Sequence, residues 1–115
     1  MWLREPLPIE VSRVANVPIG GQFWDEVADA PMNISSYNFS VRIAKSDGEP
    51  AIVILPVVVI SAVAGMIDFT INGSLLASQV GSKEAVTLSY QIKATDTFGN
   101  SVIAARGPLY LTPGI

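Results

Sequence analysis

The 115-residue sequence predicts a single all-β domain built as a sandwich of two sheets. Apolar and polar residues alternate along 37–43 and 86–94, which is typical of strands with one buried face. Turn residues separate the short Val- and Ile-rich segments at intervals of roughly 8–12 residues, and no helix of ordinary length is visible. This rhythm favours an immunoglobulin-like antiparallel β-sandwich of about seven strands.

The first 17 residues are expected to form an extended arm, followed by the sandwich domain over 18–115. Pro6 and Pro8 exclude a helix in the arm, although residues 9–14 are apolar enough for a short strand. Gly20-Gly21 is interpreted as a turn or bulge before a strand over 22–27. Trp24 in that strand is expected to anchor the core, and the alternative is an exposed platform for a sugar.

The rest of the chain divides into strands separated by polar turns. A helical turn is expected over 74–80 with Ser74 as its cap, and the last strand is expected to be interrupted by Gly107-Pro108. The expected strands cover 37–43, 51–60, 65–71, 85–95 and 101–111, and the last two are joined by a hairpin at 96–100.

Composition argues against an enzyme. The chain has no cysteine and no histidine. Thiol chemistry, disulfides and Ser-His-Asp or Cys-His catalysis therefore cannot be built from this chain alone. We expect no catalytic residue, no bound metal and no cofactor, and a hydrolase is the most remote function considered.

Two groups of acidic residues are candidate sites. Asp25, Glu26 and Asp29 lack the spacing of a calcium loop, so they are interpreted as solvated residues. Asp47, Glu49 and Asp68 fall in a turn and on an alternating strand, which argues against paired carboxylates for glycoside cleavage.

Charge and hydropathy also limit the partners. The net charge is −3, and the seven lysines and arginines are scattered in the sequence, so we expect no basic face and no nucleic-acid partner. The apolar run 51–66 is shorter than the ~20 residues of a spanning helix and contains Pro56, which argues against a membrane partner.

Hydrophobic residues make up 50% of the chain and charged residues 15%, so some apolar surface is expected to be covered by another subunit. The Val/Ile run 52–60, with Pro56, is a candidate sheet edge. Trp2 and Leu3 would latch a neighbouring subunit, the alternative being a frayed terminus. The candidate interface residues are Trp2, Leu3, Val53, Leu55, Val57, Tyr110 and Leu111.

Several segments between residues 18 and 113 occur in an order found in a known family. The segments are Gly21-Gln22-Phe23, 32–39, 65–71, 88–92, Asp96 to Gly99 and 106–109. In this order they resemble the small immunoglobulin-like domains of tailed bacteriophages, which occur in baseplate and tail-fibre-attachment proteins, and they are similar to the N-terminal domain of the baseplate upper proteins. The chain departs from the family at Gln22, where many relatives carry aspartate, and at Ser36, which replaces a glycine.

This resemblance implies a structural protein of the virion, assembled in the host cytoplasm, that acts as a tail, baseplate or fibre-attachment adaptor. Its implied partners are other virion proteins and further copies of itself. A capsid decoration protein is the alternative within the virion. A carbohydrate-binding module that contacts host-surface glycan is the alternative from another class.

Overall fold

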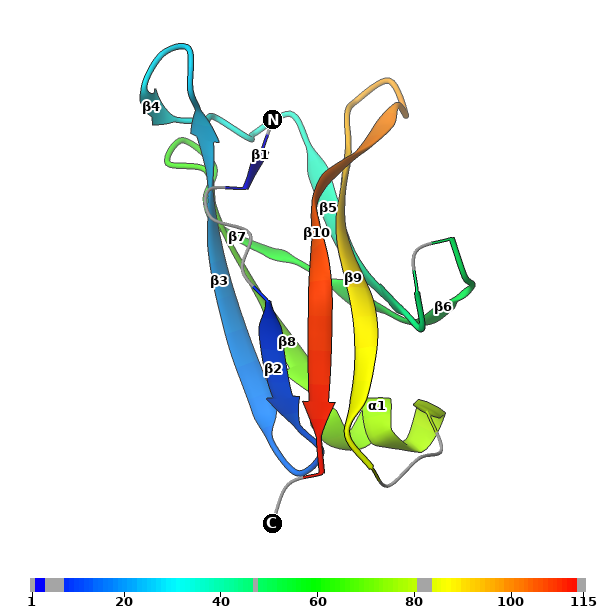
Figure 1. Ribbon diagram of the computed structural model, residues 1–115. Coiled ribbons are helices and arrows are strands. Elements are labelled where there is room, and N and C mark those ends of the chain that lie inside the picture. Colours follow the sequence, from blue (N-terminus) through cyan, green and yellow to red (C-terminus); the bar gives the residue numbers. More distant parts are fainter. Residues whose placement is uncertain (1, 4–7, 47, 81–83, 114–115) are drawn as a thin grey trace.

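The computed structural model describes residues 2–3, 8–46, 48–80 and 84–113. Within these residues there are ten strands and one short helix (Figure 1). The elements are β1 (Trp2–Leu3), β2 (Ile9–Ser12), β3 (Asn16–Asp25), β4 (Ala30–Pro31), β5 (Asn38–Ala44), β6 (Ala51–Pro56), β7 (Val58–Ser61), β8 (Met66–Asn72), α1 (Gly73–Val80), β9 (Val86–Thr95) and β10 (Ser101–Thr112).

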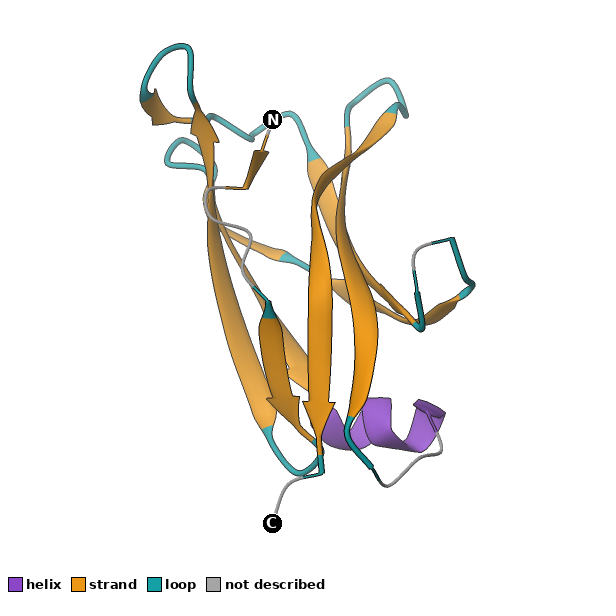
Figure 2. Cartoon of the chain, in the orientation of Figure 1, coloured by secondary structure: helices purple, strands orange, loops and turns teal. Residues whose placement is uncertain are grey.

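The strands form two five-stranded sheets that face each other (Figure 2). The first sheet has the order β1-β3-β8-β7, with β4 added beside β3. The second has the order β2-β10-β9-β5-β6. The all-β sandwich is therefore confirmed. The strands outnumber the expected seven because several are only two to four residues long, and one pair, β2 with β10, is parallel.

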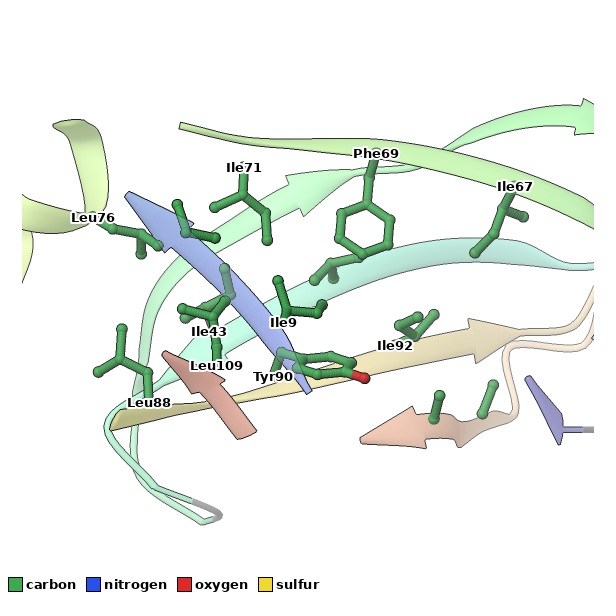
Figure 3. Close-up of a cluster of buried hydrophobic side chains, with 14 of the residues drawn as sticks. Ile9, Ile43, Ile67, Phe69, Ile71, Leu76, Leu88, Tyr90, Ile92 and Leu109 are labelled. Atoms are coloured by element: carbon green, nitrogen blue, oxygen red, sulfur yellow. The ribbon is translucent and has the colours of Figure 1, made fainter. Parts of the chain in front are cut away.

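The core lies between the sheets and is formed by the alternating residues that the sequence indicated. On β9, Leu88, Tyr90, Ile92 and Ala94 are buried. The inward residues of β8, which are Ile67, Phe69 and Ile71, face the second sheet across the gap (Figure 3). A shift of either strand by one residue would turn its whole apolar set to solvent, so the alternation fixes the register.

The aromatic anchor of β3 is Phe23, and the assignment of Trp24 to the core is wrong. Phe23 is fully buried and stacks on Phe39, with ring centroids 5.0 Å apart, while Trp24 points to the opposite face and is half-buried. The cause is Gly20-Gly21, which forms no turn: both residues pair with β8 inside one ten-residue strand. The inward positions therefore continue from Val17 and Ile19 to Phe23.

Gly107-Pro108 does not interrupt the last strand. Both residues lie in β10 and pair with Tyr90 and Ser89 of β9. A Cβ atom on Gly107 would lie 3.2 Å from the Tyr90 ring, so the glycine makes room for the buried phenol. The irregularity of β10 lies earlier, where its register with β9 shifts between Ile103 and Ala105.

Part of the expected N-terminal arm belongs to the sandwich. β2 runs parallel to β10, with Ile9 opposite Leu109 and Val11 opposite Leu111, and the side chains of Ile9 and Val11 are buried. The division into an arm over 1–17 and a domain over 18–115 does not match this pairing, because β2 completes an edge of the second sheet.

The helix expected near 74–80 is present as α1, but its cap is Asn72. The Asn72 side chain accepts a hydrogen bond from the Leu75 backbone N–H at 3.1 Å. The Ser74 hydroxyl instead donates to the Arg13 carbonyl at 3.1 Å, which ties the start of the helix to the loop after β2. An asparagine is one of the preferred N-cap residues because its carbonyl oxygen satisfies a free backbone donor.

Gly65 is predicted to tolerate substitution less well than Gly99, although both have positive φ, at 69° and 86°. A Cβ atom on Gly65 would lie 2.6 Å from the Met32 carbonyl oxygen and 2.7 Å from that of Phe23, whereas Gly99 faces open space. Gly99→Ala should lose about 1 kcal/mol of unfolding free energy from its backbone conformation. Gly65→Ala should lose about 3 kcal/mol, because backbone must also move. Urea denaturation compares them, and equal losses would contradict the close approach.

Tyr90 is predicted to make stability fall at high pH. Burial raises the pKa of its phenol above the ordinary value of 10.0. Between pH 10.0 and that raised pKa, the unfolded chain loses a proton that the folded chain keeps, so the free energy of unfolding decreases as the pH rises. Tyr90→Phe should reduce the decrease seen between pH 9 and pH 11 in urea titrations. An identical decrease in the parent and the variant would show that another group causes it.

Candidate interaction surface

The segment from Ala51 to Ser61 occupies the edges of both sheets. Its first half, β6, is the last strand of the second sheet, and its second half, β7, is the last strand of the first. The chain crosses between the sheets at Pro56-Val57, with Pro56 opposite Ser40 and Val58 opposite Asp68. The sheet edge predicted over 52–60 agrees with this order, and Pro56 lies on an edge strand, where a missing backbone donor is tolerated.

The side chains that this edge exposes differ from those expected. Val53, Leu55 and Val57 are partly buried and pack against the core. On the opposite side of the segment, Ile54 of β6 and Val58 of β7 are exposed, while Ile52 is also partly buried. A run in which every residue from 52 to 60 is apolar does not show which side faces the core, so the sequence could not decide between the two sets.

Exposed apolar side chains gather on β7 and the turn that follows it. We call this group the edge patch. Val58 is 61% exposed and Val63 is 74% exposed, and Met66 lies opposite Ser61 at the start of β8. The edge patch consists of Val58, Val59, Ile60, Val63 and Met66.

The edge patch carries no charge that would keep a second strand away. No Asp, Glu, Lys or Arg occurs from Pro50 to Ile67. Natural proteins usually protect exposed edge strands with lysine, proline or a bulge. Of these three devices, the described edge has a proline, Pro56, before β7 and a register irregularity between Val59 and Ser61, but it has no lysine. The side chains along β7 itself are therefore left apolar and uncharged. An apolar, uncharged edge of this kind is typical of a surface that a partner covers.

The other proposed interface residues lie elsewhere. Leu111 is fully buried between the sheets and cannot contact a partner, so that assignment is wrong. Tyr110, the residue before it, is 38% exposed on the outer face of the second sheet, opposite Thr87. The backbone of Trp2 and Leu3 forms β1 beside Trp24 and Phe23 of the same chain, while their side chains lie outside the described part, so their contact with a neighbour stays a prediction.

The structure gathers cations that are scattered in the sequence. Arg42 and Arg106 lie on either side of Gln91 in the cross-strand register of the second sheet. Lys93 lies two residues further along β9, and alternate residues of a strand share a face. Arg42, Arg106 and Lys93 therefore lie on one face of the second sheet, and we call these three cations the basic row. Register across three strands creates this row, and no local pattern reveals it.

A shallow, open depression adjoins the basic row. Its lining comes from the residues that directly follow β5, from β9 and from β10. Lys45 and Arg106 are its charged residues, and the rest are Ser46, Thr87, Leu88, Ser89, Gly107 and Pro108. The lining contains neither an acidic residue nor a recognisable nucleophile-and-base pair.

The acidic residues weighed as sites have local roles or lie apart. One carboxylate oxygen of Asp25 accepts hydrogen bonds from the backbone N–H groups of Val27 and Ala28, at 3.0 and 3.1 Å. Glu49 follows β5 in the second sheet, Asp68 lies on β8 of the first, and Asp47 falls outside the described residues. Within the described ranges, no cluster of three metal-ligating side chains occurs.

Comparisons of the sequence with known proteins find no match, either to a family model or to a curated protein. The structure does have a counterpart. Its fold is similar to the N-terminal domain of phage TP901-1 ORF48. The two superpose with a TM-score of 0.52 at 10% sequence identity.

The likeness to the ORF48 domain covers 91% of this chain and 84% of the other. The similarity therefore extends over most of the sandwich and is not limited to a single hairpin. The similarity to a phage domain, expected from short sequence segments, is supported at the level of the fold. At this identity, the ORF48 domain indicates a shared architecture, and the immunoglobulin-like subtype is not established by it.

No helix among the described residues of this chain is long and apolar enough to cross a membrane. The helix α1 has only eight residues.

The basic row is predicted to be too small for functional DNA binding. Three cations that neutralise three phosphates give a salt slope of only about −3, whereas proteins that bind DNA make about 6–10 phosphate contacts. Fluorescence anisotropy with a DNA duplex at physiological salt should give a dissociation constant weaker than about 100 µM. Micromolar binding that is lost in Arg106→Glu would contradict this prediction.

Proposed function

We propose that this chain is a structural protein of a bacteriophage virion and serves as an adaptor in the tail, the baseplate or the fibre attachment. Its role is assembly with other virion proteins and with copies of itself, without catalysis. The observation that carries the proposal is the edge patch, an uncharged apolar sheet edge in a protein whose fold is similar to a phage domain.

The edge offers two kinds of contact. Backbone N–H and C=O groups of β7 on the side away from β8 are available to a further strand, which gives affinity through main-chain hydrogen bonds. The side chains of the edge patch supply apolar area beside that strand. A stable contact between virion subunits buries on the order of 1,200 Å² or more, and this edge is the described surface best suited to begin one.

Two alternatives share parts of this evidence. A capsid decoration protein would use the same edge on the head lattice. A carbohydrate-binding module would instead need exposed aromatic rings. Trp24 is half-buried and lies on β3 at a position that pairs with both β1 and β4. Phe98, at the tip of the β9–β10 hairpin, is the described aromatic side chain with the greatest exposure. The genes next to the coding sequence separate tail from capsid.

The proposal predicts that the chain is present in purified phage particles and enters them through the edge patch. A double variant, Val58→Lys with Ile60→Lys, should reduce its abundance in particles at least tenfold, because two buried charges oppose the contact. Val27→Lys is the matched control, since Val27 is 99% exposed and lies in the loop between β3 and β4, outside the edge patch. Mass spectrometry of particles measures both. Absence of the parent chain from particles would reject the virion role.

A further inference from the structure

We infer that β7 pairs with β7 of a second copy of this chain, antiparallel and across a two-fold axis, so that the first sheets of two copies join into one. This inference rests on the proposed function and names the partner of the edge patch.

The geometry of the first sheet leaves β7 open to this partner. In the described chain, β7 has a single strand neighbour, β8, and it ends the order β1-β3-β8-β7. The opposite margin consists of β1, which has only two residues, and of the part of β3 beyond β1, beside which β2 packs. The four-residue β7 has no such cover among the described strands, so it is the margin of this sheet that can accept a strand of a copy.

Charge favours a second copy at this edge. Each copy carries a net charge of −3, so the net electrostatic interaction between two copies is repulsive and a contact is favoured where charge is absent. The segment from Pro50 to Ile67 is uncharged, and the nearest acid in the register is Asp68, opposite Val58 on β8. Pairing of β7 with β7 separates the two β8 strands by three strand spacings, about 14 Å, which exceeds the screening length at physiological salt.

The side chains are complementary to themselves. If the two-fold axis passes Val59, that residue lies opposite its own copy and Val58 lies opposite Ile60 of the second copy. All of these pairs are between β-branched residues, which pack well across strands. The register irregularity between Val59 and Ser61 keeps the paired segment short, so we expect a dimer of micromolar affinity that is reinforced where many copies gather.

The available area suits this arrangement. The five side chains of the edge patch are each more than 40% exposed, and three exceed 55%. Two edge patches together would bury on the order of 1,000 Å², which is near the lower limit for a specific interface. Ile54, exposed on the adjoining β6, adds to the surface at its margin.

Single cysteines test the pairing directly, because the chain has none of its own. Val58→Cys, Val59→Cys and Ile60→Cys are oxidised at micromolar concentration, with Val27→Cys as control, and disulfide dimers are measured on non-reducing gels. Across an antiparallel two-fold pair, only the residue at the axis meets its copy, while residues one step away have Cα atoms roughly 8 Å apart, beyond disulfide reach. We expect one maximum within these three positions, at least fivefold above the control.

Two results would overturn the pairing. Equal yields at all three positions would indicate a parallel or unspecific contact, and yields no higher than that of Val27→Cys would exclude self-pairing. Light scattering gives a second measurement: the parent mass should rise from 12.2 kDa toward twice that value with concentration, while Val58→Lys with Ile60→Lys stays at 12.2 kDa. Circular dichroism of each variant confirms that it is folded.

The particle assay separates this inference from the proposed function. If cysteine cross-linking fails while the abundance of the double lysine variant in particles is still reduced, the edge patch binds a different virion protein, and only the self-pairing is rejected. If cross-linking shows one maximum while the parent chain is absent from particles, the pairing holds and the virion role is rejected.

Discussion

The shared apolar layer between β8 and β9 is the constraint on which the rest of the structure depends. Every second residue of each strand is buried in this layer. The residues are Ile67, Phe69 and Ile71 on β8 and Leu88, Tyr90 and Ile92 on β9. Because side chains alternate along a strand, the burial of these residues also fixes which residues face outward. The basic row of the second sheet and the outward position of Val58 both follow from it.

The crossover at Pro56-Val57 gives one segment two roles. On its inner side, Val53, Leu55 and Val57 help to close the core at the open margin of the sandwich. On its outer side, the same run places apolar groups in solvent along β7. A segment that closes one margin of a sandwich is usually polar on its outer side, and this one is apolar on both. The inner side forms an interface within the molecule, and the pairing of β7 proposed above would use the outer side.

Local patterns predicted the parts of the fold that depend on local chemistry. The alternation along β5, β8 and β9, the hairpin at Asp96 and the short helix were all anticipated, because strand parity and turn residues are properties of neighbouring positions. The prediction of which side chains face the core was wrong across Gly20-Gly21, where a continuous strand was interpreted as a turn or bulge. This error led to Trp24 being predicted as the core anchor in place of Phe23.

Features that depend on contacts between residues far apart in the chain could not be predicted from the sequence. The alignment of Arg42 with Arg106 needs the register of three strands, and the burial of Leu111 needs the first sheet above it. The edge position of residues 52–60 was predicted because Pro56 and the lack of charge are visible locally, but its outward side chains were not.

The parallel pairing of β2 with β10 governs when the molecule becomes complete. Ile9 pairs with Leu109, one hundred positions later. During translation, β2 leaves the ribosome long before its neighbour exists, and its apolar residues have no sheet to join. The second sheet therefore closes only after residue 112 has emerged, and contacts of such long sequence separation make this last step slow. Newly made copies consequently pass through a period in which β2 has no strand partner.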